Sequence, residues 1–140
     1  MGGMIAFGEK LAALFTPGSH GSTFAGNPLG AAAGLATLDV IEDENLVANA
    51  EARGEQLRDG IMATGNPLFV SVRGRGLLDA VELKHPCSHA VMNYCLEHGL
   101  IVNAVAPNAL RFAPPLIVTE QDVDQALAIL KDVPTDLPDD

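Results

Sequence analysis

The sequence predicts a mixed α/β chain that ends in a small α+β domain, and three observations lead to this fold class. From residue 68 onward the expected elements follow the order strand, strand, helix, strand, strand, helix, which favours helices covering one face of a mostly antiparallel sheet. Several segments repeat apolar residues every three or four positions, as amphipathic helices do. With 140 residues that are 48% hydrophobic, the chain is long and apolar enough for one hydrophobic core.

The N-terminal part is expected to contain a long loop between short elements. Residues 4–7 read as a short strand, and residues 9–15 as one or two helical turns. Residues 15–27 are rich in Gly, Ser and Thr, which indicates a loop. Asn27 followed by Pro28 is an N-cap with proline at the first helical position, so a helix is expected to run through Ile41. Its many small residues predict close packing.

The C-terminal elements are justified in order by caps, spacing and turn residues. A helix is expected from Asn45 to about residue 65, then strands at 69–72 and 77–83 joined by residues 73–76. A third helix is expected from Pro86 to Gly99, followed by strands at 100–103 and 109–112. Thr119-x-x-Asp122 resembles a capping box and predicts the last helix. Residues 133–140 form an acidic tail.

Charge and composition exclude several classes of function. Lys+Arg number 8 and Asp+Glu 18, giving a net charge of −10, and aromatic residues are only 4% of the chain, so nucleic acid is not an expected partner. No apolar run approaches the length of a membrane span, and residues 1–15 lack the basic leader of a secretion signal. Cys87 and Cys95 do not form a metal or redox spacing, which fits a cytoplasmic protein.

Two groups of residues are candidate sites, each with a simpler alternative. The loop at residues 20–28 combines glycines, hydroxyls and a capped helix start, which suits an anion; the alternative is an ordinary helix entry. Arg111, taken alone, is explained by a surface ion pair. His85 and His89 have the i, i+4 spacing of zinc ligands near Cys87, but no third ligand is evident, so solvated histidines are favoured and no metal is expected.

Four motifs in order resemble one enzyme family. Residues 20–29 read HGSTFAGNPL, residues 72–78 VRGRGLL, residues 99–103 GLIVN, and residues 110–116 LRFAPPL. Together they resemble the class III (fold-type I) pyridoxal-phosphate aminotransferases, and acetylornithine and ornithine aminotransferases are the members they resemble most. The resemblance covers about residues 4–130. It implies that residues 1–44 are the end of the large cofactor-binding domain, with a phosphate-contacting loop at 16–27, and that residues 45–132 are the C-terminal small domain.

The resemblance also implies roles for particular residues. Thr23 matches a threonine whose hydroxyl and N–H bind the phosphate of pyridoxal 5'-phosphate in the partner subunit of a homodimer. Ser22 matches a position lining the substrate site, and Arg111 matches an arginine that pairs with a carboxylate of the substrate or of an internal glutamate. The implied reaction moves an amino group from N-acetylornithine to 2-oxoglutarate in arginine biosynthesis. The ornithine, succinylornithine and 4-aminobutyrate enzymes share these motifs and remain alternatives.

The chain departs from the family because three groups that the family's cofactor chemistry needs are not identifiable: a lysine, an aspartate paired with the pyridinium nitrogen, and an aromatic ring over the cofactor. The lysine that forms the Schiff base with the cofactor is not identifiable, because none of Lys10, Lys84 and Lys131 lies in the family's lysine context. We therefore expect a C-terminal segment with no catalytic residue of its own, which is inactive in isolation. A non-catalytic α+β interaction module that dimerises or binds a partner is the alternative of a different class.

Overall fold

The computed structural model describes residues 8–16, 18 and 21–139, and it divides into two compact units, Met1–Glu44 and Asn45–Asp140. The strand expected at residues 4–7 lies outside the described residues. Across the described part of the chain, no helix has both the length and the apolar character that crossing a membrane requires.

The first unit contains helix α1 (Glu9–Ala12) and helix α2 (Pro28–Asp43). The expected cap of α2 is confirmed, because Asn27 Oδ1 accepts hydrogen bonds from the N–H groups of Leu29 at 2.9 Å and Gly30 at 3.3 Å. The close packing expected for α2 is not found in the described part of this unit. Gly30 is the buried residue of the helix, whereas Leu35 and Leu38 are exposed.

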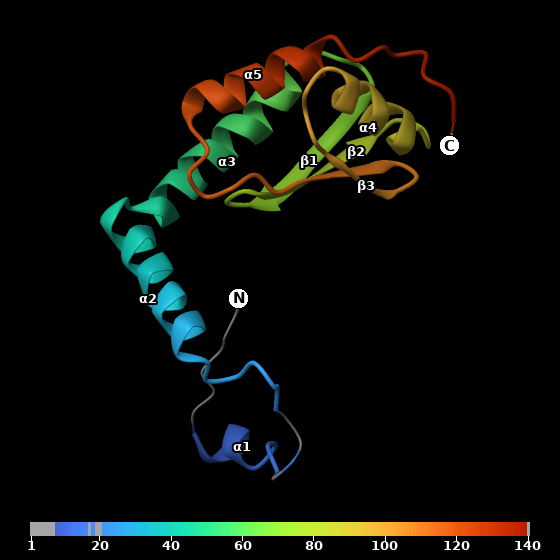
Figure 1. Ribbon diagram of the computed structural model, residues 1–140. Coiled ribbons are helices and arrows are strands. Elements are labelled where there is room, and N and C mark those ends of the chain that lie inside the picture. Colours follow the sequence, from blue (N-terminus) through green and yellow to red (C-terminus); the bar gives the residue numbers. More distant parts are fainter. Residues whose placement is uncertain (1–7, 17, 19–20, 140) are drawn as a thin grey trace. The chain divides into compact units, whose positions relative to one another are not determined.

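The second unit is a four-stranded antiparallel sheet with its helices on one side (Figure 1). The strands lie in the order β1-β2-β4-β3, and each neighbouring pair is antiparallel, as the element order predicted. The bounds of the strands are Phe69–Arg75 for β1, Leu78–Leu83 for β2, Asn103–Ala106 for β3 and Ala109–Phe112 for β4. Those of the helices are Leu46–Ala63 for α3, Ser88–Glu97 for α4 and Glu120–Lys131 for α5.

The core lies between the sheet and these helices. Along β2, Asp79, Val81 and Leu83 are buried, and they alternate with more exposed residues, as expected for a strand with one covered face. The residues paired with Asp79 and Val81 on β4, Phe112 and Leu110, are buried on the same face. The helices supply further fully or nearly fully buried apolar side chains: Leu57, Ile61, Val91 and Leu130.

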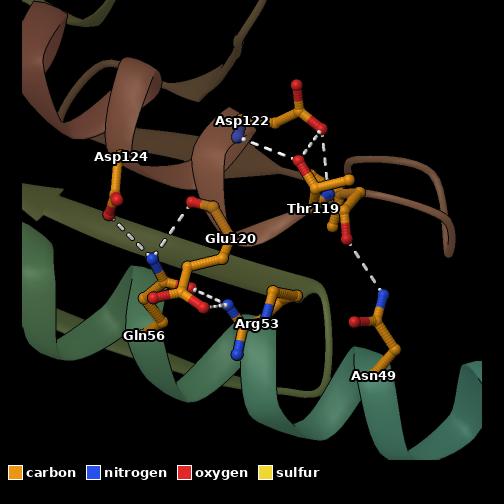
Figure 2. A network of polar contacts seen from close by, with 8 residues as sticks. Asn49, Arg53, Gln56, Thr119, Glu120, Asp122 and Asp124 are labelled. Carbon is orange, nitrogen blue, oxygen red and sulfur yellow. Dashed lines mark hydrogen bonds and ion pairs between the residues drawn. The ribbon is translucent and has the colours of Figure 1, made fainter.

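A polar network fixes α3 against the start of α5 (Figure 2). Asn49 Nδ2 donates to the carbonyl oxygen of Val118 at 3.0 Å, and Gln56 Nε2 donates to Asp124 Oδ1 at 2.8 Å. At the start of α5 the capping box is complete, since Thr119 Oγ1 accepts from the N–H of Asp122 and Asp122 Oδ2 accepts from the N–H of Thr119. The sequence prediction for this helix start is confirmed.

Two boundaries differ from the prediction because local backbone bonds compete with the expected element. Helix α4 starts at Ser88 rather than Pro86, because the N–H of Cys87 bonds back to the carbonyl of His85 at 2.9 Å and Cys87 has a non-helical backbone, with φ of −136° and ψ of 26°. Strand β3 starts at Asn103 rather than at residue 100, because the N–H of Leu100 closes the end of α4 on the carbonyl of Cys95 at 2.8 Å.

The segment at residues 73–76 is also partly different from the expectation. Arg73, Gly74 and Arg75 belong to β1 and pair with β2, so only Gly76 and Leu77 form the turn. Gly76 has φ of +56°, a left-handed conformation that favours glycine. Both arginines are thus held on a strand rather than in a connection.

The acidic tail is attached to the second unit by Val133, by Leu137, which packs against the core, and by Asp139. Val133 is buried, and its carbonyl accepts a hydrogen bond of 2.8 Å from Asn66 Nδ2. Further along, Asp139 Oδ1 lies 2.7 Å from His85 Nδ1. Asp136 and Asp139 of the tail are nevertheless exposed to solvent.

Candidate functional site

The turn before α2 presents hydrogen-bond donors to solvent. Ser22 organises this turn, since its hydroxyl oxygen accepts from the N–H of Phe24 at 3.3 Å and its carbonyl accepts from the N–H of Ala25 at 3.1 Å. Thr23 is exposed, and within the described residues its hydroxyl and N–H make no hydrogen bond. A left-handed Gly26, with φ of +68°, then turns the chain into Asn27.

These donors fit a phosphate group, with one restriction. The N–H groups of Leu29 and Gly30, which would otherwise point at an anion, are already bonded to Asn27 Oδ1. An anion here would therefore be bound through Thr23, whose hydroxyl and N–H are both available. Two donors satisfy only part of a phosphate, so the remaining donors must come from other residues.

Arg111 lies on β4 in the second unit and faces away from the helices. Its Cα is paired with Ala80 on one side and Asn103 on the other, and its Nη2 donates to Asn103 Oδ1 at 3.1 Å. Ala80 has only a methyl side chain, which leaves space beside the guanidinium. Arg111 is exposed and forms no ion pair within the described part of the chain, so its planar fork is available to a carboxylate. Among the described residues, the alternative of a surface ion pair is not found.

A cavity of about 380 Å³ opens beside Arg111. Its wall is mostly apolar, with Leu57, Phe112 and Val123 at its base and Pro114 following β4. The polar lining residues are Arg111, Asn103 and Asp122. An apolar cavity with a few polar groups is typical of small-molecule sites.

The electrostatics of the cavity favour an anion at Arg111 rather than at Asp122. Hydrogen bonds from the side chain and backbone of Thr119 hold the pKa of Asp122 below its ordinary value, so this carboxylate is charged at neutral pH. It is already bound by Thr119 Oγ1 at 2.6 Å. The arginine is therefore the group in the cavity wall with unused capacity to bind a carboxylate.

The predicted site residues fall into two groups. Ser22 and Thr23 are neighbours in the turn of the first unit, and Arg111 belongs to the second unit. Asn103 was part of a recognised motif, but its role as the hydrogen-bond partner of Arg111 was missed. The contact follows from the pairing of Asn103 with Arg111 between β3 and β4, which carry residues of the motifs at 99–103 and 110–116. The sequence prediction placed the start of β3 too early and did not give this pairing.

The histidine and cysteine candidates do not form a metal site. His85 precedes α4, so it does not share a helix face with His89, and it contacts Asp139 instead. No group of three metal-ligating side chains is found among the described residues. Cys95 is a buried thiol whose pKa burial raises to about 11, so it is protonated at neutral pH.

The comparison with known proteins decides the family. The family described as "Aminotransferase class-III" matches residues 3–133. The chain belongs to the class III aminotransferases. Over all 140 residues it is 99% identical to the acetylornithine aminotransferase of Bifidobacterium longum (strain NCC 2705), of which it covers 32%. As a class III aminotransferase sequence, it therefore spans about a third of the length of the relatives it matches.

Solved structures of class III aminotransferases agree with this assignment. The acetylornithine aminotransferase of Elizabethkingia anophelis matches with a TM-score of 0.74 and 38% identity, covering 86% of this chain and 33% of that one. The ornithine aminotransferase of Toxoplasma gondii, crystallised with oxidised glutathione, matches with a TM-score of 0.75 and 35% identity, covering 87% and 30%. That structure has pyridoxal phosphate (PLP) at partial occupancy in its active site. The mixed helix and antiparallel sheet of this chain is thus part of an aminotransferase fold.

Proposed function

We propose that this segment works as the C-terminal part of a cytoplasmic, homodimeric acetylornithine aminotransferase of arginine biosynthesis. The observation that carries the proposal is the 99% identity over the whole chain to the Bifidobacterium longum enzyme. In the proposed reaction, an amino group moves from N-acetylornithine to 2-oxoglutarate. Pyridoxal 5'-phosphate, when bound, carries the amino group between the two substrates.

Thr23 and Ser22 are the residues that we assign to the cofactor side of the site. The hydroxyl and N–H of Thr23 would donate to the cofactor phosphate of the partner subunit, and the free state of both donors supports this role. The oxygen of the Ser22 hydroxyl accepts from Phe24, so its hydrogen is free to donate to the substrate. The exposure of this turn supports a contact made by another part of the enzyme.

Arg111 is the residue that we assign to substrate recognition. Its guanidinium would bind a substrate carboxylate in a two-point contact, with Asn103 fixing the side chain from the opposite strand. The apolar wall of the cavity lowers the local dielectric and strengthens that contact. The chain's lysines, Lys10, Lys84 and Lys131, are all exposed and are not assigned to the chemistry.

The activity is tested by placing this segment in the Bifidobacterium longum enzyme in place of the enzyme's own. With N-acetylornithine and 2-oxoglutarate the chimera should form glutamate at the parent's rate, and the 140-residue chain alone should form none. A folded chimera without activity contradicts the proposal. A chimera that prefers ornithine as donor would instead support the alternative suggested by the ornithine aminotransferase structures.

The cofactor role of Thr23 has a separate test in the same chimera. Thr23→Val removes the hydroxyl and should weaken cofactor binding by roughly tenfold, as expected for one hydrogen bond to a charged group. Thr37→Val is the matched control, because the Thr37 hydroxyl bonds only within α2, to the carbonyl of Ala33. Equal cofactor affinity in the two variants would remove Thr23 from the site.

A further inference from the structure

Arg111 differs from the arginines of α3 in the charge of its hydrogen-bond partner. Arg53 and Arg58, both on α3, lie 3.3 Å and 2.9 Å from a carboxylate oxygen. The partner of Arg111 is the amide of Asn103, whose Oδ1 accepts from Arg111 Nη2 at 3.1 Å. An amide oxygen is a neutral acceptor, so it fixes the guanidinium without neutralising its charge.

The contact between Asn103 and Arg111 follows from the pairing of β3 with β4. Asn103 is the first residue of β3, and its Cα is the register partner of Arg111. Side chains that are directly opposite in an antiparallel pair lie on the same face with their Cβ atoms about 5 Å apart, which the short asparagine spans. On the other side of Arg111, the register partner on β2 is Ala80, which has no polar side-chain atom. Of these two register neighbours, Asn103 is therefore the one that can hold the guanidinium.

The bond to Asn103 occupies only one side of the guanidinium. A guanidinium offers a carboxylate two pairs of parallel N–H groups, Nε with Nη2 and Nη1 with Nη2, and the two pairs use different hydrogens of Nη2. Asn103 Oδ1 accepts one of these two hydrogens, so this bond leaves one complete pair unused. A carboxylate that binds the unused pair meets a guanidinium that is already held in one orientation, beside the cavity that both side chains line.

We infer that Asn103 is a positioning residue for Arg111, and that its amide determines which pair of N–H groups receives the substrate carboxylate. This inference rests on the proposed function, which assigns Arg111 to substrate recognition. Asn103 acts through Arg111 and need not contact the substrate. Its neutrality is essential to this role, because a carboxylate at position 103 would bind the guanidinium itself and compete with the substrate.

The first test exchanges the amide for a carboxylate of nearly the same shape. In the cofactor-loaded full-length chimera, Asn103→Asp should raise the Kd of glutarate, an unreactive dicarboxylate, by about tenfold or more in titration calorimetry, because the new carboxylate occupies Arg111. Asn108→Asp is the matched control, since Asn108 is exposed in the turn between β3 and β4 and gains the same charge. Salt screens this more distant exposed charge, so the Kd should stay within about twofold of the parent's. Equal Kd values in the two variants would overturn the inference.

The second test separates positioning from a purely structural role by a double-mutant cycle. Asn103→Ala removes the acceptor and should raise the Kd of glutarate by roughly tenfold, as expected for one hydrogen bond to a charged group. In the Arg111→Gln background the same change should alter the Kd by less than about twofold, because the guanidinium that Asn103 positions is absent. An equal rise in the two backgrounds would show a structural role and contradict the inference.

The two tests distinguish failure of this inference from failure of the proposed function. If Arg111→Gln binds glutarate as tightly as the parent, the assignment of Arg111 to the substrate fails, and the inference fails with it. If Arg111→Gln weakens binding while both Asn103 variants bind as the parent does, the inference alone fails. Asn103 is exposed, so its replacement should leave the Tm of the chimera close to the parent's.

Discussion

Arg58 and Asp79 form an ion pair between helix α3 and strand β2, with 2.9 Å between Arg58 Nη1 and Asp79 Oδ1. The same guanidinium nitrogen donates to the carbonyl of Gly76 at 2.9 Å, so one side chain binds both the strand and the turn that precedes it. Asp79 is buried, and its second oxygen, Oδ2, has no hydrogen-bond partner within the described structure. Burial raises the pKa of Asp79, and Arg58 opposes that shift.

Replacement of Arg58 should be strongly destabilising near neutral pH. Arg58→Gln leaves the Asp79 carboxylate buried without its counter-charge, and we expect a loss of about 3 kcal/mol in the free energy of unfolding. The folded pKa of Asp79 is raised, so protonation of this carboxyl favours the folded state. The contribution of Asp79 to the free energy of unfolding is therefore fully present below its unfolded pKa and is lost as pH rises through its folded pKa. The difference between variant and parent should therefore shrink in acid, as measured by urea unfolding across pH. A pH-independent difference would contradict this account.

Gly54 of α3 is required by a close approach of two backbones. A Cβ at this position would lie 1.8 Å from the carbonyl oxygen of Gly76, which cannot move without disturbing the turn. Gly54→Ala should therefore destabilise the chain by about 1–3 kcal/mol, despite the higher helix propensity of alanine. Gly60→Ala on the same helix is the control, because its Cβ would meet only the movable end of the Leu127 side chain. Thermal unfolding that ranks Gly60→Ala as the more damaging change would refute the argument.

The capping box of α5 predicts a pH-dependent effect. Thr119→Ala removes the acceptor for the N–H of Asp122 and should cost about 1 kcal/mol, as is usual for an N-cap. It should also raise the pKa of Asp122, whose folded value Thr119 holds below the ordinary one. The stabilisation that the lowered pKa of Asp122 gives the folded state is present above the unfolded pKa of this residue and is lost as pH falls through its folded pKa. Carboxyl NMR titration measures the pKa of Asp122 in each variant. Thr119→Ser keeps the hydroxyl and should keep the low pKa of the parent. A Thr119→Ala variant in which the pKa of Asp122 equals that of the parent would contradict the assignment.

Cys95 should be chemically inert in the folded protein. Its thiol is buried, and its pKa is about 11, so little thiolate exists for reaction. In the Cys87→Ser variant, where Cys95 is the remaining cysteine, an aromatic disulfide reagent at about pH 8 should react only after unfolding. Reaction of the native variant at the rate of a small thiol would show that this part of the core opens readily.

Local signals in the sequence were sufficient for most of the fold. The Asn27 and Thr119 caps and the strand expected at residues 77–83 depend on neighbouring residues, and the structure has both caps and a strand at Leu78–Leu83. The start of β3 was wrong because the bond from Leu100 to Cys95 ends α4 in a way that composition does not reveal. The Arg58–Asp79 pair joins residues 21 positions apart, so only tertiary packing brings it together.

The candidate site shows the same division between local and long-range information. The motif containing Arg111 could be recognised from consecutive residues, but its row with Arg73, Ala80 and Asn103 follows from strand pairing. That pairing was hidden from the sequence because residues 73–76 read as a connection. The availability of the Arg111 guanidinium is likewise a property of the folded sheet.

The most direct test of the proposed function is the kinetic effect of Arg111→Gln in the full-length chimera. If Arg111 binds a substrate carboxylate, the variant should lose roughly 10- to 100-fold in kcat/KM, as expected for a charged hydrogen-bonded contact. Arg53→Gln is the matched control, because Arg53 of α3 is paired with Glu120 of α5, and the variant should retain the parent's kcat/KM. An Arg111→Gln variant as active as the control would contradict the assignment of Arg111 to the substrate site.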